Sequence, residues 1–237
     1  MHKIVFFISN FISYFIYGTE NRRVWRGRVN ICLFYPSIRR FIKQAYGEKV
    51  KSIKFIRQRT LNRMVCMVNN KYYIKVFRNV SVQQLKDFEF LNNYVEQRLK
   101  VKIPHIVADN KIPMYACEHL DGKLITEFDK SYVLENDQKV LKQIHGIIGQ
   151  LQRIKVDEIP NKERFFNSMQ LRTKEEPCRH PKQVLAHFDL NELNFLFDDN
   201  LNICAVIDWD TLSIANNPST DTTIFLKYWN AYKRRGR

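Results

Sequence analysis

His-Phe-Asp-Leu-Asn-Glu-Leu-Asn at residues 187–194 and Ile-Asp-Trp-Asp at residues 207–210 are the two stretches that decide the fold of this 237-residue chain. The residues between them, 195–206, form two short apolar runs around an Asp-Asp-Asn turn, a pattern typical of a β-hairpin. A hairpin brings its two outer ends together. We therefore expect three polar side chains to converge at one edge of a cleft: Asp189, Asn194 and Asp208.

These residue types suit phosphoryl transfer. That reaction needs a carboxylate to orient the attacking hydroxyl and oxygen ligands to hold Mg²⁺ on the nucleotide phosphates. It also needs a cation on the phosphates, and Lys75 stands in the middle of the apolar stretch Tyr-Tyr-Ile-Lys-Val-Phe. His187 fits a packing and hydrogen-bonding role better than a proton-carrying one. For Glu192 and Asp210 the pattern leaves open whether they support the site or are merely solvated.

Hydrophobic periodicity predicts the elements that carry these residues. In the N-terminal half it predicts a helix at residues 82–99 and strands at residues 50–56, 64–68, 72–77 and 114–119. The pair Asn69-Asn70 predicts a hairpin turn between the second and third strands. In the C-terminal half, residues 133–154 have helical periodicity. The predicted fold class is α+β: a small sheet lobe with one helix, followed by a mainly helical lobe that carries the hairpin.

The order of these motifs resembles the superfamily of aminoglycoside phosphotransferases and choline kinases, which are small-molecule relatives of the protein kinases. The resemblance is carried by H-x-D-x-x-x-x-N followed by I-D-W-D, after a strand lysine, a helix acid and an interlobe linker. The similarity runs from about residue 51 to residue 221. It implies a bilobal protein-kinase-like fold and a kinase that uses ATP and Mg²⁺. It also implies that Asp189 is the catalytic base, Asn194 a Mg²⁺ ligand and Asp208 the principal Mg²⁺ ligand.

The same resemblance implies contacts with the nucleotide. Lys75 would bind the α- and β-phosphates and pair with an acid on the following helix. Glu89 is the first choice for that acid, and Asp87 competes with it. The stretch Tyr-Ala-Cys-Glu-His-Leu-Asp-Gly resembles the interlobe linker, whose backbone near Glu118 and Leu120 would receive adenine. The sequence leaves the choice between ATP and GTP open.

The chain departs from the family's pattern in four places, one of which is Leu151-Gln152, where the corresponding helix of the family ends in Leu-His. The family's first hairpin has a glycine before a Ser-Asn pair; here Asn62 matches and the glycine does not, so Arg59 or Arg63 is an alternative source of charge at the phosphates. Asn217 replaces the first aspartate of the D-P-x-x-D motif. The insert that builds a pocket for antibiotics or choline is short, at residues 157–182, which argues against both substrates.

Composition limits the other functions. A hydrophobic content of 45% places the chain among folded globular proteins. Its five scattered cysteines contain no C-x-x-C pair, which argues against a disulfide framework and against a zinc site. No nucleic-acid-binding motif accompanies the net charge of +15. We therefore expect a protein of a reducing compartment, the cytoplasm, without a nucleic-acid partner.

Positive charge is concentrated at the N-terminus. Residues 1–60 contain thirteen Lys or Arg and two Glu, a net charge of +11 that favours an anionic partner. Residues 4–17 are apolar, but a bilayer span needs about 20 residues. One interpretation is a helix packed on the protein. The other is an interfacial anchor, with Trp25 and its neighbouring arginines at the headgroups of an anionic membrane.

The leading hypothesis is transfer of the ATP γ-phosphate to a sugar hydroxyl of a lipopolysaccharide core or another lipid-linked envelope glycan, at the inner face of the bacterial cytoplasmic membrane. In size and character the chain is similar to lipopolysaccharide core heptose and sugar kinases. The alternatives are a soluble small-molecule or protein kinase, and a degenerate kinase-fold binding module. The expected domains are a basic N-terminal extension (1–45), an N-lobe (46–119) and a C-lobe with the catalytic loop (120–237). Neither the acceptor hydroxyl nor the oligomeric state follows from the sequence.

Overall fold

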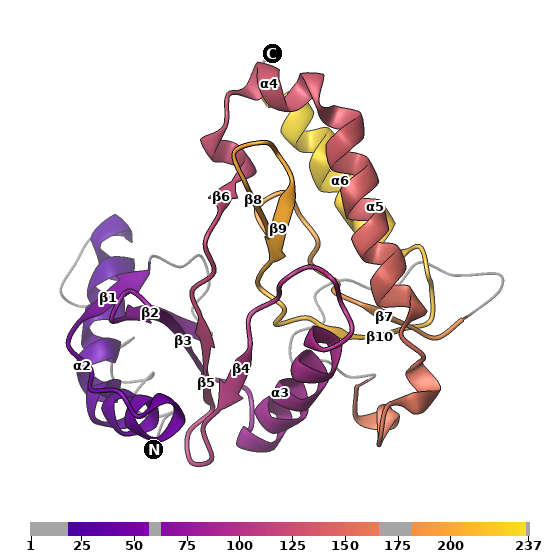
Figure 1. Cartoon of the computed structure of the whole chain (residues 1–237). Helices are drawn as coiled ribbons and strands as arrows, with labels where there is room; N and C mark the ends of the chain where they lie inside the picture. The colour runs from indigo at the N-terminus through magenta and orange to yellow at the C-terminus, as the bar shows by residue number, and fades with distance from the viewer. Residues whose placement is uncertain (1–18, 57–62, 166–181, 236–237) are drawn as a thin grey trace. The chain divides into compact units, whose positions relative to one another are not determined.

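The structure is a computed structural model that describes residues 19–56, 63–165 and 182–235 (Figure 1). The chain divides into two compact units: residues 1–89 with 105–119, and residues 90–104 with 120–237. The first unit contains an antiparallel sheet and the second is mainly helical, so the expected α+β class is confirmed. The predictions for residues 4–17, Arg59 and Asn62 lie outside the described residues, and the predicted domain boundaries stay predictions.

The sheet of the first unit has five antiparallel strands in the order β1-β2-β3-β5-β4. They are β1 (Ile53–Ile56), β2 (Arg63–Val68), β3 (Tyr72–Phe77), β4 (Ile106–Ala108) and β5 (Met114–Glu118). Four of them were predicted from alternation, whereas β4 has only three residues and is too short to show a period. The predicted turn between β2 and β3 is confirmed: Asn69 and Asn70 both have φ of 54°, the left-handed conformation that such a hairpin turn requires.

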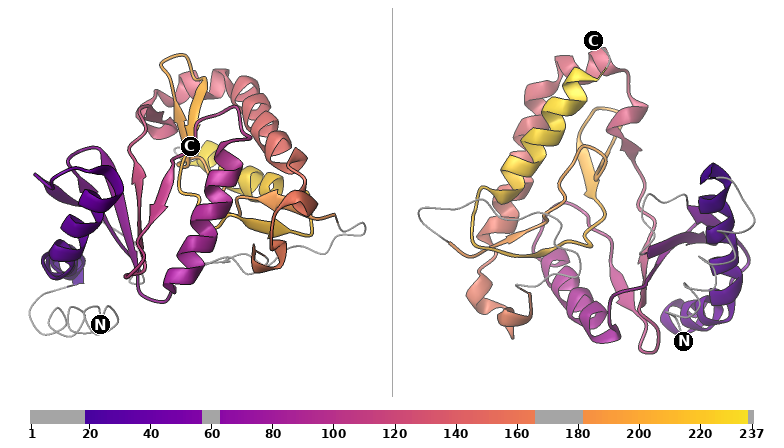
Figure 2. Two further views of the ribbon diagram at one scale, coloured as in Figure 1. Left: turned by 60° about the horizontal axis from the view of Figure 1, so that its bottom comes forward. Right: turned by 180° about the vertical axis from the view of Figure 1, so that it is seen from behind.

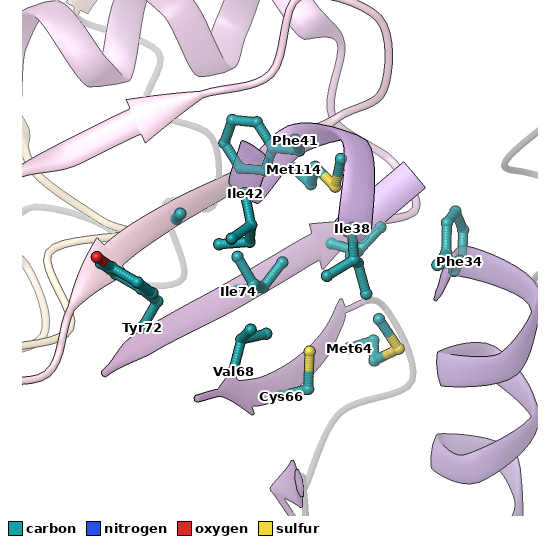
Figure 3. Packing of buried hydrophobic residues seen from close by; sticks show 12 residues of the cluster. Phe34, Ile38, Phe41, Ile42, Met64, Cys66, Val68, Tyr72, Ile74 and Met114 are labelled. Atoms are coloured by element: carbon teal, nitrogen blue, oxygen red, sulfur yellow. The ribbon is translucent and has the colours of Figure 1, made fainter. Parts of the chain in front are cut away.

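Helix α2 (Thr19–Tyr46) covers one face of this sheet. Its residues Phe34, Ile38, Phe41 and Ile42 are 0–3% exposed and share one apolar core with the sheet residues Met64, Cys66, Val68, Tyr72, Ile74, Val76, Met114 and Ala116 (Figure 3). Arg40 of α2 also forms an ion pair with the buried carboxylate of Asp109, which follows β4. The last three turns of α2 are therefore part of the first unit's core.

Helix α3 (Val82–Glu96) begins in the first unit and faces the other side of the sheet. Side chains alternate along β3, so Lys75 lies on the face opposite to the one that α2 covers. On that face Phe88 of α3 packs on Tyr115, with ring centroids 5.5 Å apart. Lys75 Nζ lies 5.6 Å from the centroid of the same Tyr115 ring. The strand lysine and the helix after it therefore share a face, as the sequence predicted.

Among the described residues, the second unit contains the end of α3 and three further helices: α4 (Lys130–Glu135), α5 (Asp137–Arg153) and α6 (Thr220–Arg234). Figures 1 and 2 show α5 and α6 side by side, and Trp229 Nε1 donates to Asp137 Oδ1 between them at 2.6 Å. The helix predicted at residues 133–154 is confirmed over Asp137–Arg153, but its first residues belong to the separate helix α4, which ends before Asn136. The Asn136 amide donates to the Tyr132 carbonyl at 2.9 Å and ends α4. The described part of this unit also contains three short 3₁₀ segments: Ile125–Glu127, Val156–Glu158 and Lys162–Phe165.

Two small sheets hold the site of the second unit. Strands β6 (Lys123–Leu124), β8 (Phe195–Phe197) and β9 (Ile203–Val206) pair in the order β6-β8-β9, and β7 (Val184–Ala186) pairs with β10 (Ser213–Ala215). The predicted hairpin is confirmed as β8-β9, with Phe195 opposite Val206. Periodicity did not predict β10 or α6. None of the described helices is long and apolar enough to cross a bilayer.

Candidate functional site

The β8-β9 hairpin brings the three predicted catalytic residues to one place in the second unit. The Asn194 amide donates to the backbone carbonyl of Asp189 at 2.7 Å. The Ile207 N–H donates to the backbone carbonyl of Asn194 at 2.9 Å. Asp208, the next residue after Ile207, is therefore held near Asn194. The side chains of Asp189 and Asp208 are partly exposed, whereas Asn194 is 6% exposed. The geometry fits the predicted roles, which stay predictions.

The backbone is strained on both sides of this site. Phe188 and Asp208 have φ of 62° and 61°, in the left-handed region that residues with a Cβ rarely adopt. Each such residue costs about 1–3 kcal/mol and persists only where surrounding contacts hold it. Strain of this kind is common at functional sites. Contacts with other residues must therefore hold Phe188 and Asp208 in this conformation.

Asp221 holds Phe188 in its left-handed conformation. Its Oδ2 accepts from the His187 N–H at 2.8 Å and its Oδ1 from the Phe188 N–H at 2.9 Å. The carboxylate is 1% exposed, and this burial raises its pKa to about 6 although the two hydrogen bonds favour the charged form. Asp221, in the first turn of α6, therefore fixes the start of the catalytic loop. The sequence showed this residue in the Asn-Pro-Ser-Thr-Asp stretch but gave it no role.

His187 is a structural residue of the same loop. Its side chain is fully buried and packs on Trp209, with ring centroids 4.6 Å apart. Nδ1 accepts from the Asp189 N–H at 3.3 Å, which leaves Nε2 to donate to the Ile207 carbonyl at 3.3 Å. Burial lowers the pKa of His187 to about 4, so the ring is neutral at neutral pH. These contacts agree with the predicted packing role and link both sides of the site.

Three more side chains complete the loop. Asn191 donates from its amide to the Asp189 carbonyl at 3.1 Å, and its Oδ1 accepts from the Leu193 N–H at 2.9 Å. The Thr211 hydroxyl donates to the His187 carbonyl at 2.5 Å. Asp210 is 3% exposed, so it is not a solvated residue. Sequence reasoning missed Asn191 and Thr211, because hydrogen bonds to backbone carbonyls leave no periodic signal in a sequence.

Asn194 and Asp208 fit a Mg²⁺ ion that is shared with a nucleotide. The Nδ2 of Asn194 is used by Asp189, which leaves Oδ1 as the atom that could ligate a cation. Within residues 19–56, 63–165 and 182–235, no three His, Cys, Asp or Glu side chains are grouped to hold a metal ion. A site with one carboxylate and one amide oxygen suits Mg²⁺, which keeps several waters and takes phosphate oxygens as ligands.

The first unit carries the predicted phosphate-binding residues. Lys75 is half-buried on β3, on the same sheet face as α3. Glu89 Oε2 lies 2.9 Å from Lys86 Nζ, and its Oε1 accepts from the Ala108 N–H at 3.0 Å, so Glu89 ties α3 to β4. Asp87 accepts from Gln83 Nε2 at 3.0 Å on the same helix. The pairing of Lys75 with Glu89 or with Asp87 stays a prediction.

The predicted adenine-binding linker lies at the boundary of the two units. Glu118 ends β5, and the following His119 N–H donates to the Lys71 carbonyl at 2.7 Å. Leu120 is the first residue of this stretch in the second unit. The role of Glu118 and Leu120 in holding adenine stays a prediction.

Comparison with known proteins supports the fold. Comparison with protein-family models and with curated proteins gave no match. Among solved structures, the chain is similar to the GDP complex of wild-type aminoglycoside 2'-phosphotransferase-IIIa, with a TM-score of 0.59 and 15% identity over 86% of this chain and 83% of that one. It is also similar to the streptomycin–ATP complex of APH(2")-IIa (TM-score 0.55, 14% identity, 78% and 73% covered).

A third similar structure is the macrolide 2'-phosphotransferase MphH from Brachybacterium faecium, with a TM-score of 0.55 and 16% identity over 84% of this chain and 83% of that one. These likenesses extend over most of each chain and confirm the kinase-like fold of the antibiotic phosphotransferases. At such low identities they define the fold alone. The chemistry has to be argued from the site.

Proposed function

We propose that this protein is a kinase that transfers the γ-phosphate of ATP to a sugar hydroxyl. The observation that carries the proposal is that Asp189, Asn194 and Asp208 lie together at the open end of the β8-β9 hairpin, where Asn194 donates to the Asp189 carbonyl and the residue before Asp208 donates to the Asn194 carbonyl. It supplies a partly exposed carboxylate beside two oxygen ligands, which is what phosphoryl transfer requires. A degenerate binding module would have no need for a strained loop held by buried hydrogen bonds.

Each residue of this arrangement has one task. Asp189 orients the acceptor hydroxyl and takes its proton as the new O–P bond forms, while the bond between the γ-phosphorus and the β,γ-bridging oxygen breaks and ADP leaves. Asn194 and Asp208 would hold Mg²⁺ through oxygen atoms, and Lys75 of the first unit would neutralise the nucleotide phosphates. When bound, Mg²⁺ supplies positive charge for the phosphate oxygens in the transition state. Positioning and charge stabilisation dominate this reaction, so a rigid loop matters as much as the identity of the base.

For the acceptor we propose a lipid-linked envelope glycan, such as a lipopolysaccharide core sugar, at the inner face of the cytoplasmic membrane. Two features support this. Residues 1–60 carry a net charge of +11, which suits anionic lipid or phosphorylated glycan. On the outer surface of α2, Tyr35 is 40% exposed and shares a helix face with the exposed Arg39 and Lys43, which lie one and two turns further on. Apolar and basic side chains on one helix surface suit a headgroup layer.

A soluble acceptor is the second candidate, and the similar structures favour it. They include a phosphotransferase in complex with streptomycin and another that is named for macrolides. Both acceptors are small molecules that bear sugar hydroxyls. The same residues would serve such an acceptor, and the N-terminal charge would then have no part in substrate binding.

The test measures transfer of labelled γ-phosphate from ATP with Mg²⁺ into three acceptor pools run in parallel. The pools are an envelope glycolipid extract, free sugars with aminoglycosides and macrolides, and a soluble protein extract. Asp189→Asn is the matched control, because it removes one carboxylate charge at almost unchanged size. GTP replaces ATP in a parallel series.

The expected result is label in the glycolipid fraction with the wild-type protein and none with the control variant. Label confined to soluble sugars or antibiotics would overturn the glycolipid acceptor and keep the kinase. Nucleotide binding without transfer to any pool, or no nucleotide binding, would refute the kinase proposal.

A further inference from the structure

Glu192 lies in the catalytic loop between Asp189 and Asn194, and its side chain is 3% exposed. Its Oε1 lies 3.3 Å from Nη1 of Arg235, which caps the C-terminal end of α6. Its Oε2 is buried and has no hydrogen-bond partner among the residues that the structure describes. A buried carboxylate is stable only when a charged or hydrogen-bonding partner compensates for its lost hydration. The Arg235 guanidinium is that partner.

Hydrogen bonds hold the backbone of Arg235, and its side chain is 66% exposed. Its N–H donates to the carbonyls of Ala231 and Tyr232 at 3.1 and 3.2 Å. Lys130 of α4 donates from Nζ to the carbonyls of Arg235 and Lys233. A cation at the last carbonyls of a helix is also favoured by the helix dipole. Lys130 of α4 therefore holds the backbone at the end of α6 in place. The Arg235 guanidinium at this end is the counter-charge of Glu192.

The same helix holds the catalytic segment at two other points. Asp221 in its first turn accepts from the N–H groups of His187 and Phe188. In its middle, the Phe225 ring packs edge-on against Phe195 of β8, with centroids 5.9 Å apart. Helix α6 thus contacts the loop at three points. Asp221 holds the start of the loop, Phe225 packs next to the end of the loop, and Arg235 pairs with Glu192 within the loop.

We propose that Glu192 is a positioning residue: its ion pair with Arg235 makes the C-terminal turn of α6 the third anchor of the catalytic loop and fixes the orientation of Asp189 and Asn194. Hydrogen bonds of Asn191 and Asn194 hold the loop from within, and the ion pair of Glu192 connects its middle to the end of α6. A residue displaced by as little as about 1 Å can lower the rate of an enzyme about 100-fold. The inference rests on the proposed function for its kinetic consequence, but not for its structural one.

The first test uses amide hydrogen exchange and needs no activity. Arg235→Gln and Glu192→Gln should both speed exchange of the amides in residues 187–194 about tenfold or more, while the amides of α5 keep their protection. Arg234→Gln is the matched control, since Arg234 is the preceding residue on the helix and is exposed. Unchanged exchange in the loop in both variants, with folding verified by the thermal midpoint, would overturn the proposal.

The second test separates positioning from a general loss of stability. At a temperature at which all variants are folded, both substitutions should lower kcat about tenfold or more and leave KM for the nucleotide within about twofold. The double variant should be no worse than either single one, because both remove the same ion pair. Additive losses would contradict the coupling. If the wild-type protein transfers no phosphate, the proposed function fails, and the exchange experiment still decides whether the anchor exists.

Discussion

At the scale of single residues, the site depends on hydrogen bonds that hold strained backbone. Phe188 and Asp208 are both in the left-handed region, on either side of the β8-β9 hairpin. Asp221 holds the N–H group of Phe188, and His187 links Asp189 to Ile207, the residue before Asp208. We propose that the Asp189 carboxylate acts on the acceptor and the Asp208 carboxylate on the metal, so the two should respond differently to substitution.

We predict that Asp208→Asn abolishes turnover and lowers Mg²⁺-dependent nucleotide affinity, because it removes a charged metal ligand. Asp189→Asn should lower kcat by about 100-fold or more and leave nucleotide affinity nearly unchanged, because it removes only the base. Titration of each variant with ATP, with and without Mg²⁺, measures affinity apart from turnover. An equal loss of affinity in both variants would contradict these separate roles.

His187 predicts a pH dependence of stability. Its pKa is about 4 in the folded protein against 6.5 for an unperturbed histidine. The folded state therefore binds fewer protons, and the contribution of His187 to stability is present above pH 6.5 and lost as the pH falls towards 4. Each pKa unit corresponds to about 1.4 kcal/mol, so the loss should be about 3 kcal/mol. Urea unfolding of the wild-type protein and His187→Gln between pH 7.5 and 4.5 measures it. A stability difference between them that stays constant with pH would refute the assignment.

At the scale of elements, the second unit depends on the close approach of β6 to the β8-β9 hairpin. Gly122 precedes β6 and has φ of 143°, which L-residues with a side chain rarely adopt. A Cβ at this position would lie 2.8 Å from Leu196 Cβ and 2.9 Å from Cys204 Sγ. Both neighbours belong to the hairpin that carries the site.

Gly122→Ala should therefore destabilise the protein by about 1–3 kcal/mol, through backbone strain and overpacking together. It should also lower activity, since the displaced hairpin carries Asn194 and Asp208 at its ends. Chemical unfolding measures the first effect and turnover the second. Gly47→Ala is the control: that glycine also has a positive φ, of 69°, but nothing lies within 4 Å of its Cβ. Equal losses in both variants would show that strain alone is responsible.

At the scale of the whole molecule, the N-terminal region has two different parts. The last turns of α2 contribute Phe34, Ile38, Phe41 and Ile42 to the core of the first unit. Residues 1–60 as a whole carry a net charge of +11. A truncation experiment can separate the structural part from the part proposed to bind an anionic surface.

Removal of residues 1–45 should unfold the first unit, because it deletes four buried side chains worth about 1.5–3 kcal/mol each, against a typical net stability of about 5–15 kcal/mol. Removal of residues 1–18 spares that core and should leave the thermal midpoint and nucleotide binding nearly unchanged. Sedimentation with vesicles that contain anionic lipid should then show weaker binding than the full chain, with neutral vesicles as the control. Full binding after the shorter truncation would argue against the anchor.

Much of the fold was predictable from the sequence because it is encoded locally. Alternation along Tyr72–Phe77 predicted β3, the Asn69-Asn70 pair predicted its turn, and the Asp-Asp-Asn turn predicted the β8-β9 hairpin. The helix predicted at residues 133–154 was wrong at Asn136, because a side-chain cap interrupts a run whose apolar period continues. Strands of three residues contain too few positions to show a period, so β4 and β10 were missed, whereas the equally short β8 was predicted from the turn that follows it.

The candidate site was likewise predictable from the sequence only in part. The sequence by itself determined the residue types and their order: the strand lysine, the loop with Asp189 and Asn194, and the hairpin that ends before Asp208. Only the tertiary structure decided which distant groups hold them. Asp221 is 34 residues from His187, and Arg235 is 43 residues from Glu192. These contacts form when α6 packs beside the hairpin. The same packing buries the carboxylates of Asp221 and Glu192, and a buried carboxylate needs a hydrogen-bonding or charged partner.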